Sequence, residues 1–301
     1  MNISPGFLKK GDTIGIAAPA RSVSEEIITG AENVFRSWGL EIYRGKNLSG
    51  KFNQCSGTEQ QRLDSLQEII DNKDIKAIIC AGGGYGSIHL IDKLKVENLK
   101  KYPKWLTGFS DITLLHFLFL GKGEVQTLHA TMPVKFKKNT ESKKSIASLY
   151  NALFGKQLIY RIGSSPYNRI GRSKGIVIGG NLSILYSLLG TPYDIDFTGK
   201  ILFIEEVDEY LYHIERMMYS LKLAGKFNNL KGLIVGNISK VHDNDIPFGK
   251  NEYEIICDII KEYDFPVIFG FPAGHEKLNL ALYLGKEAEI NVQHNEAIIG
   301  Y

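Results

Sequence analysis

The chain has 301 residues, 44% of them hydrophobic and 23% charged, which is ordinary for a globular protein of about two domains. Lys and Arg number 36 against 33 Asp and Glu, and nucleic-acid binders usually carry a stronger basic excess. Three widely spaced cysteines (Cys55, Cys80 and Cys257) make neither a disulfide framework nor a zinc site. With no signal-like N-terminus and no apolar run of about 18 residues, we expect a cytoplasmic protein without membrane or nucleic-acid partners.

The first half of the chain alternates predicted strands and helices. A Ser-x-x-Glu capping box at Ser22 and Glu25 predicts the first helix start, and Thr58 with Gln61 predicts the second. Repeated βαβ units predict a parallel sheet with helices on both faces and sites at the carboxyl ends of its strands. Strands are expected at residues 13–18, 40–43, 76–81, 105–107 and 124–128, and helices after residues 22 and 58 and at 87–94 and 111–120.

The composition changes near the middle of the chain. We predict an N-terminal α/β domain over residues 1–155, a linker over 156–169 and a C-terminal domain over 170–301. A lysine-rich run before the linker reads as a solvated connection rather than an anion site; it comprises Lys135, Lys137, Lys138, Lys143 and Lys144. Strands are expected at 175–180, 201–204, 230–235 and 266–269, helices at 142–153, 181–189 and 211–223, and a hairpin over 286–300.

Ser110 lies at a predicted turn from a strand into a helix, in residues 108–112 (GFSDI). Such a corner resembles a nucleophile elbow, although the elbow pattern ends in glycine and this chain has Ile112. The backbone N–H of Asp111 would lie in the first helical turn, where it has no intrahelical partner and can donate to an oxyanion. The alternative is that Ser110 only caps the helix.

Two further residues at strand ends would complete a catalytic set. Glu205 directly follows the strand 201–204, and His275 lies in the glycine- and proline-containing loop after the strand 266–269. A serine nucleophile needs a base and a group that orients the base. The alternatives are a solvated acidic turn for Glu205 and a structural role for His275.

The glycine run at residues 82–86 fits neither the dinucleotide-binding nor the P-loop pattern. It either brings backbone N–H groups close to a substrate, as a second oxyanion donor, or forms a tight turn.

Several motifs, in order along nearly the whole chain, resemble those of the LD-carboxypeptidases. These serine peptidases include murein tetrapeptide carboxypeptidase and the microcin C self-immunity proteins. The motifs are residues 11–19 (GDTIGIAAP), 83–86 (GGYG), 108–113 (GFSDIT), 179–183 (GGNLS), 190–192 (GTP), 202–205 (LFIE), 214–217 (IERM) and 270–275 (GFPAGH).

The resemblance implies that Ser110 is the nucleophile, His275 the general base and Glu205 the residue that orients His275. It implies an oxyanion hole from the backbone amides of Asp111 and of Gly83 and Gly84. The implied fold is a flavodoxin- or Rossmann-like parallel-sheet domain that supplies the serine, and a more β-rich α/β domain that supplies Glu and His, with the active site at their interface. The resemblance also implies a homodimer, and it implies no metal or cofactor. The family motif often reads Glu-Asp, so Glu206 remains an alternative to Glu205.

The function implied is hydrolysis of an L,D-peptide bond, releasing a C-terminal D-amino acid from a murein tetrapeptide. A first alternative is a self-immunity hydrolase that cleaves peptidyl or aminoacyl nucleotide antibiotics. A second, of another class, is a non-catalytic two-domain protein that binds a small ligand.

Overall fold

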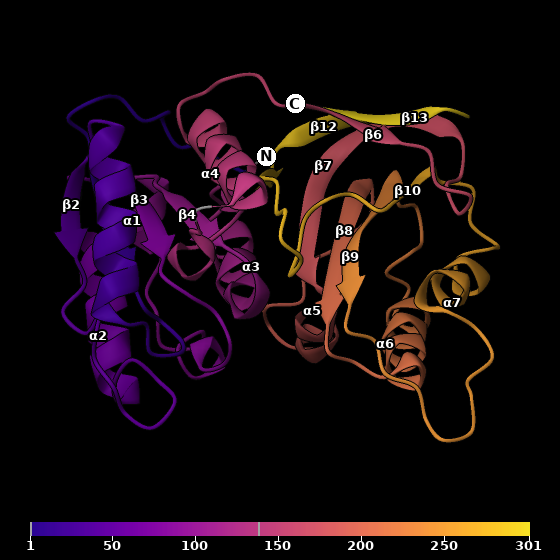
Figure 1. Cartoon of the computed structure of the whole chain (residues 1–301), viewed down its shortest axis with the longest axis horizontal. Helices are drawn as coiled ribbons and strands as arrows, with labels where there is room; N and C mark the ends of the chain where they lie inside the picture. The colour runs from indigo at the N-terminus through magenta and orange to yellow at the C-terminus, as the bar shows by residue number, and fades with distance from the viewer. Residues whose placement is uncertain (1, 138) are drawn as a thin grey trace. The chain divides into compact units, whose positions relative to one another are not determined.

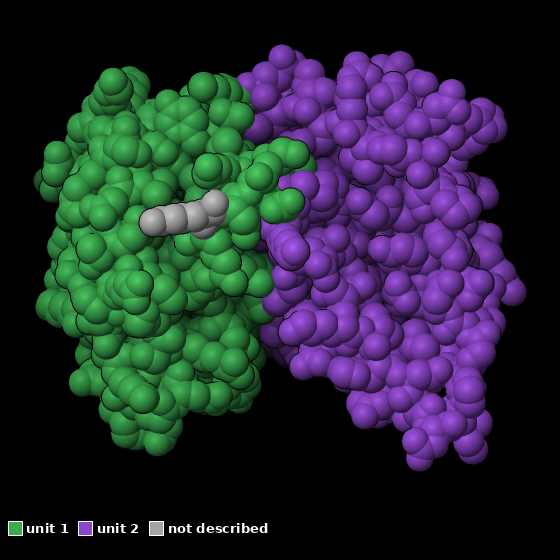
Figure 2. Space-filling view, viewed as in Figure 1, with its two compact units in different colours: residues 1–156, 280–285 green, residues 157–279, 286–301 purple. Residues whose placement is uncertain are grey.

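The chain forms two compact units in a computed structural model that describes residues 2–137 and 139–301, so Lys138 of the lysine-rich run lies outside the described residues. Unit 1 takes the chain up to Lys156 and the later segment Leu280–Gly285 (Figure 2). Unit 2 takes Gln157–Asn279 and Lys286–Tyr301. The chain therefore enters unit 1 twice.

Unit 1 is built on a six-stranded sheet in the order β11-β5-β4-β3-β1-β2. Figure 1 labels three of these strands, β2, β3 and β4. All neighbouring strands are parallel except β11, which is antiparallel to β5. Strands of a parallel sheet are apolar on both faces because helices cover both, and Ile14, Ile16 and Ile78 are fully buried. The strands are β1 (Thr13–Ala17), β2 (Glu41–Arg44), β3 (Ile75–Cys80), β4 (Trp105–Gly108), β5 (Thr127–His129) and β11 (Leu282–Leu284).

The loops after β1 and β3 lie where the order of the strands in the sheet changes direction. From β1 the chain continues to β2 on one side of the sheet, and β3 lies on the other side. In an open α/β sheet, such a switch leaves a crevice at the carboxyl ends of the two strands, where ligands bind.

Four α-helices complete unit 1, and two of their starts test the predicted capping boxes. Thr58 and Gln61 form the predicted box at the start of α2. The box at Ser22 is wrong, because α1 begins after Ser24 and the Ser22 hydroxyl donates to the Gly50 carbonyl at 2.8 Å. The helices are α1 (Glu25–Ser37), α2 (Glu59–Asp71), α3 (Thr113–Gly121) and α4 (Thr140–Leu153).

The predicted helix over residues 87–94 is also wrong. Only the short 3₁₀ helix η1 (Ser87–His89) forms there, followed by turns. Two more short 3₁₀ helices, η2 (Glu97–Lys100) and η4 (Pro133–Lys135), lie in connections.

Unit 2 is built on a seven-stranded mixed sheet in the order β10-β9-β8-β7-β12-β13-β6. The strands from β10 to β7 are parallel, and β12, β13 and β6 add to the edge as antiparallel neighbours. Its strands are β6 (Ile159–Gly163), β7 (Gly171–Asn181), β8 (Lys200–Val207), β9 (Gly232–Ser239), β10 (Val267–Phe269), β12 (Glu287–Val292) and β13 (Glu296–Gly300), and its helices are α5 (Leu182–Leu188), α6 (Leu211–Leu223) and α7 (Glu252–Ile259).

The predicted α/β class is confirmed, with a mainly parallel first sheet and a more β-rich mixed second sheet. The division into units differs from the sequence boundaries in two places. Residues 156–169, expected as a linker, contain the strand β6, and residues 280–285 return to unit 1. None of the helices in residues 2–137 and 139–301 has both the length and the hydrophobicity to span a bilayer.

Candidate active site

Ser110 occupies a strained corner between β4 and α3 in unit 1. Its φ is +64°, a left-handed conformation that is uncommon for a residue with a side chain and that concentrates at functional sites. Phe109 is the N-cap of the 3₁₀ helix η3 (Ser110–Ile112) that leads into α3, so Ser110 is not a capping residue. Ser110 is half-buried in this strand–turn–helix arrangement, which is the context that a nucleophile elbow requires.

Gly108 allows this corner to close tightly. A Cβ at Gly108 would lie 2.9 Å from Cγ2 of Ile112, so the missing side chain makes room for the isoleucine that replaces the last glycine of the elbow pattern. The Gly108 carbonyl is within hydrogen-bonding distance of His116 Nε2 at 3.0 Å, and it accepts from the Ala130 N–H at 3.1 Å. A buried imidazole on α3 therefore fixes the end of β4.

The glycine loop after β3 lies directly against Ser110. A Cβ on Gly83 would lie 3.3 Å from both the Ser110 Cβ and the Phe109 carbonyl oxygen. Gly84 follows with a φ of +105°, which favours glycine. Of the predicted oxyanion residues, the structure thus brings Gly83 next to Ser110 within unit 1.

Asp111 contributes its side chain to the same loop. Its buried carboxylate accepts a hydrogen bond from the Ser87 N–H at 3.0 Å. Burial raises the pKa of Asp111, and the hydrogen bond from Ser87 opposes that shift. The Asp111 backbone N–H lies in the first turn after Ser110, where no intrahelical acceptor exists.

Arg62 organises these loops and was missed in the sequence. It is 2% exposed, and its Nη1 donates to the carbonyls of Pro19 at 2.6 Å and Gly86 at 2.8 Å. Its Nε donates to the Gly57 carbonyl at 3.3 Å. One buried cation thus joins the loops that follow β1 and β3. The available signal was an arginine on the apolar stripe of α2, at helical spacing from Leu66 and Ile69.

In unit 2, Glu205 and His275 form a hydrogen-bonded pair. The Nδ1 of His275 lies 2.7 Å from Glu205 Oε2, and the Glu205 side chain is fully buried whereas that of His275 is 17% exposed. A carboxylate bound at Nδ1 keeps the proton on that nitrogen and leaves Nε2 as the basic one. The solvated acidic turn is wrong for Glu205, because β8 extends to Val207 and carries Glu205 into the core.

A β-bulge places this pair. Ile204 is opposite Val235 and Glu206 is opposite Ile238, so Glu205 alone faces two residues of β9. Bulges re-aim side chains and occur next to active sites. The bulged backbone also holds the histidine loop, since the Asn237 N–H donates to the Ala273 carbonyl at 2.8 Å.

Glycines on both sides of Glu205 allow close packing. A Cβ on Gly274 would lie 2.9 Å from Glu205 Oε2, and one on Gly236 would lie 3.3 Å from Glu205 Cβ. Gly179 lies close to the end of β7, where a Cβ would overlap the Phe203 carbonyl oxygen at 1.9 Å. These glycines therefore serve close backbone contacts within unit 2.

Glu206 has a different environment from Glu205. Its carboxylate accepts from Asn181 Nδ2 at 2.8 Å, the Ser183 N–H at 2.7 Å and the Val207 N–H at 2.8 Å, which ties the start of α5 to β8. Burial, together with the neighbouring Glu205 carboxylate, raises the pKa of Glu206 to about 7. Of the two glutamates, Glu205 is the one whose hydrogen bond to a histidine is observed.

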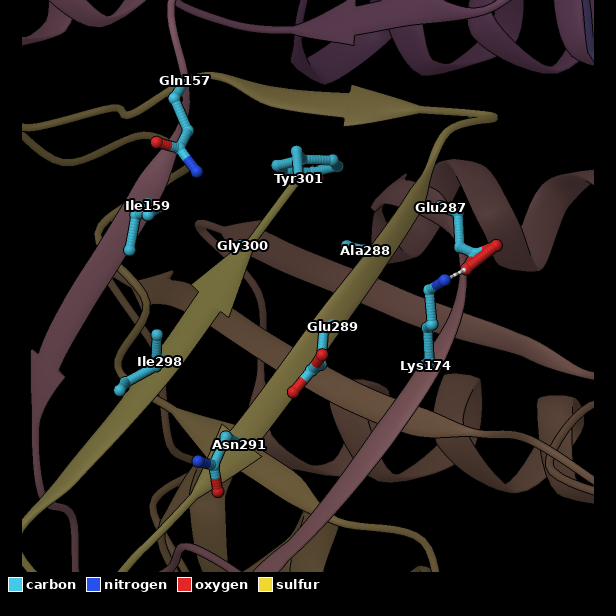
Figure 3. A pocket seen from close by; sticks show the side chains of 10 residues that line it. All are labelled: Gln157, Ile159, Lys174, Glu287, Ala288, Glu289, Asn291, Ile298, Gly300 and Tyr301. Atoms are coloured by element: carbon cyan, nitrogen blue, oxygen red, sulfur yellow. Dashed lines mark ion pairs between the residues drawn. The ribbon is translucent and has the colours of Figure 1, made fainter.

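An open hollow of about 610 Å³ lies elsewhere in unit 2, over β6, β7, β12 and β13 (Figure 3). Glu287, Glu289 and Asn291 alternate along β12 on this face, and Glu287 pairs with Lys174. The lining includes neither Glu205 nor His275, so this hollow gives no support to the catalytic assignment. In the part of the chain that the structure describes, no three His, Cys, Asp or Glu side chains are placed to hold a metal ion.

Comparison with known proteins identifies the family. Models described as the LD-carboxypeptidase N-terminal and C-terminal domains match residues 14–130 and 174–290. The chain is 31% identical to a probable murein peptide carboxypeptidase of Bacillus subtilis, over 99% of this chain and 95% of that protein. It is 28% identical to the microcin C7 self-immunity protein of Escherichia coli, over 97% and 94%. The crystal structure of muramoyltetrapeptide carboxypeptidase from Oxalobacter formigenes matches with a TM-score of 0.87 at 25% identity, over 96% and 98%.

This chain therefore belongs to the LD-carboxypeptidase family and is a hydrolase of the serine peptidase class. The family recognised from the sequence motifs is confirmed.

Proposed function

We propose that the protein is a serine LD-carboxypeptidase that releases the C-terminal D-amino acid from murein-derived tetrapeptides. The observation that carries the proposal is the 2.7 Å pair of His275 Nδ1 and Glu205 Oε2. Ser110, in its left-handed corner, supplies the nucleophile. Two names support this substrate class: the probable murein peptide carboxypeptidase of Bacillus subtilis and the muramoyltetrapeptide carboxypeptidase of Oxalobacter formigenes.

In the proposed reaction, Ser110 Oγ attacks the carbonyl carbon of the last peptide bond while His275 Nε2 accepts the hydroxyl proton. Glu205 stabilises the imidazolium that results. Collapse of the tetrahedral intermediate breaks the C–N bond, and His275 returns the proton to the leaving amine. Water then attacks the acyl ester with His275 again as the base, which releases the shortened peptide and restores Ser110.

The oxyanion that forms on the substrate carbonyl needs preorganised donors. The Asp111 N–H and the amides of the Gly83–Gly84 turn are proposed for this role. Support comes from the packing of Gly83 against Ser110, and from the fixed geometry that Arg62 and His116 impose on the two loops.

The test is release of D-alanine from a murein tetrapeptide. Ser110→Ala and His275→Ala should each lower kcat by roughly 10⁴- to 10⁶-fold, and the double variant should lose little more, because the residues act as a unit. Equal D-alanine release by wild type and Ser110→Ala would remove the nucleophile assignment.

The two glutamates give a matched pair of variants. Glu205→Gln should lower kcat by about 10⁴-fold, since an amide at that position favours the wrong histidine tautomer. Glu206→Gln should have a much smaller effect, because the Glu206 carboxylate accepts hydrogen bonds from Asn181, Ser183 and Val207 and so holds the start of α5. The reverse ranking would make Glu206 the triad acid.

The likeness to the microcin C7 self-immunity protein supports a second candidate, hydrolysis of an aminoacyl nucleotide antibiotic. An aminoacyl-sulfamoyl nucleoside assayed beside the tetrapeptide separates the two by the ratio of kcat/KM values. A phosphonate that labels Ser110 would exclude the purely ligand-binding alternative.

We also propose that the protein is a cytoplasmic homodimer. Light scattering, which measures the molecular mass in solution, would test whether it is a dimer.

A further inference from the structure

Arg21 lies in the loop after β1 and contacts the glycine loop beside Ser110. Its backbone N–H donates to the Gly83 carbonyl at 3.3 Å, and its backbone bridges to Cys55 on the other side. The backbone of Arg21 is thus held between two loops at the carboxyl edge of the unit 1 sheet.

The Arg21 side chain extends over Gly84. A Cβ built on Gly84 would lie 2.4 Å from Arg21 Cδ and 2.7 Å from Arg21 Nε. The arginine therefore occupies the space that a side chain at residue 84 would take. The Arg21 guanidinium therefore places a positive charge on the glycine loop, in which Gly83 lies next to Ser110.

Arg21 has no carboxylate partner among the described residues, whereas Arg36, Arg44, Arg161 and Arg172 each pair with a glutamate. Arg21 is exposed, and within residues 2–137 and 139–301 no carboxylate is paired with it. A guanidinium without a carboxylate partner, held at a loop next to a nucleophile, is suited to an anionic ligand.

The location within the fold also points to a ligand. Arg21 and Gly84 follow β1 and β3, the two strands between which the strand order reverses. In open α/β sheets, ligands bind in the crevice at such a switch point. A peptide cleaved one residue from its end carries its terminal carboxylate close to the bond that Ser110 attacks.

We propose that Arg21 binds the terminal carboxylate of the substrate and so determines that cleavage occurs only at the last peptide bond. This inference rests on the proposed peptidase function. Arg21 is a specificity residue in this scheme and takes no part in proton transfer. Its planar fork can donate two parallel hydrogen bonds to one carboxylate, which a lysine cannot reproduce.

The first experiment compares a murein tetrapeptide with the same peptide amidated at its C-terminus. Wild type should prefer the free acid, and Arg21→Ala should lose roughly 10- to 100-fold in kcat/KM on the acid, the usual range for a charge-assisted bond, with little change on the amide. Arg21→Lys should restore part of the preference. The control is Arg36→Ala, which removes an equal charge from the last turn of α1. Equal losses on both peptides, or no loss, would overturn the proposal.

The second experiment separates this proposal from the catalytic one. Calorimetry with the Ser110→Ala variant measures binding of both peptides without turnover. Acid binding that exceeds amide binding, weakens with salt and disappears in Arg21→Ala/Ser110→Ala would support the carboxylate site even if wild type released no D-alanine. Equal binding of acid and amide by Ser110→Ala would overturn it, whatever the outcome for catalysis.

Discussion

His116 is a histidine whose burial gives it a measurable effect on stability. It is completely buried on α3, and its Nε2 lies 3.0 Å from the Gly108 carbonyl oxygen. Burial lowers the pKa of His116 from 6.5 to about 4, and the hydrogen bond to Gly108 opposes part of that shift. The folded state therefore keeps this imidazole neutral, with the Nε2–H donating to the Gly108 carbonyl at the end of β4.

The sign of the effect on stability follows from these values. Between pH 6.5 and about 4 the unfolded chain binds a proton at this site and the folded chain does not. The free energy of unfolding of unit 1 should fall by about 3 kcal/mol as the pH is lowered through this range. His116→Gln, which keeps a donor but does not titrate, should show a shallower slope.

The measurement can be confined to unit 1, because both tryptophans, Trp38 and Trp105, belong to it. Urea unfolding followed by tryptophan fluorescence at several pH values gives the slope directly. Identical slopes for wild type and His116→Gln would show that His116 does not titrate between the two states.

Among single residues, the sequence predicts some members of the candidate site and not others. Ser110, Glu205 and His275 each come at or just after the end of a predicted strand, so a rule about strand ends can single them out. Arg21 and Arg62 act through contacts with Gly84 and Gly86, residues distant in sequence. No local pattern connects such pairs, because only the folded loops bring them together.

At the level of elements, the bulge in β9 is the feature that determines where Glu205 points. Gly236, in the bulge, has no room for a side chain, since a Cβ would lie 2.6 Å from the Ala273 carbonyl oxygen and 2.9 Å from Phe203 Cε2. The added residue in β9 therefore depends on glycine at this position. Neither β-propensity nor alternation in residues 230–239 indicates it, because a bulge is a property of two paired strands.

Gly236→Ala should reduce activity more than stability. The methyl group would displace the Ala273 loop and with it His275, and small displacements of catalytic groups cost roughly 100-fold in rate. We expect kcat for D-alanine release to fall by about 10- to 100-fold. Gly163→Ala in β6, where a Cβ meets nothing within 4 Å, is the matched control and should leave kcat unchanged. Wild-type kcat in Gly236→Ala would show that the bulge does not position the pair.

Most elements were predictable from periodicity and capping, and the two strands that were not predicted share a cause. The strands β6 and β11 are short strands at the sheet edges, and in the described part of the chain their neighbours are β13 and β5, respectively. Their hydrogen bonds join residues that are more than 130 positions apart, such as Leu282 and His129. A local hydrophobic pattern cannot show which sheet such a strand joins.

For the whole molecule, the second entry of the chain into unit 1 makes that unit depend on the C-terminal part of the sequence. Tyr283 of β11 is 1% exposed, and its hydroxyl donates to the Ala152 carbonyl at 2.7 Å. Its ring packs on Trp105 with centroids 5.4 Å apart. Tyr283, which belongs to the C-terminal part of the sequence, is thus part of the core formed by the first half.

Tyr283→Ala should destabilise unit 1 by about 3–5 kcal/mol, as expected for removal of a large buried aromatic side chain. Tyr283→Phe should cost about 1 kcal/mol, the usual net value of one hydrogen bond. Urea unfolding followed by the fluorescence of Trp38 and Trp105 measures both changes in stability. An unchanged midpoint in Tyr283→Ala would show that β11 contributes nothing to the stability of unit 1.

The late strand β11 also has a consequence for how the protein is made. The residues of β5 emerge from the ribosome well before those of β11 are synthesised. At a synthesis rate of about 5–20 residues per second, the interval is on the order of ten seconds. Throughout that time β5 presents an unpaired strand edge, which can pair with other chains. The nascent protein should therefore depend on chaperones most strongly before residue 285 emerges, and slower translation of the second half should increase aggregation.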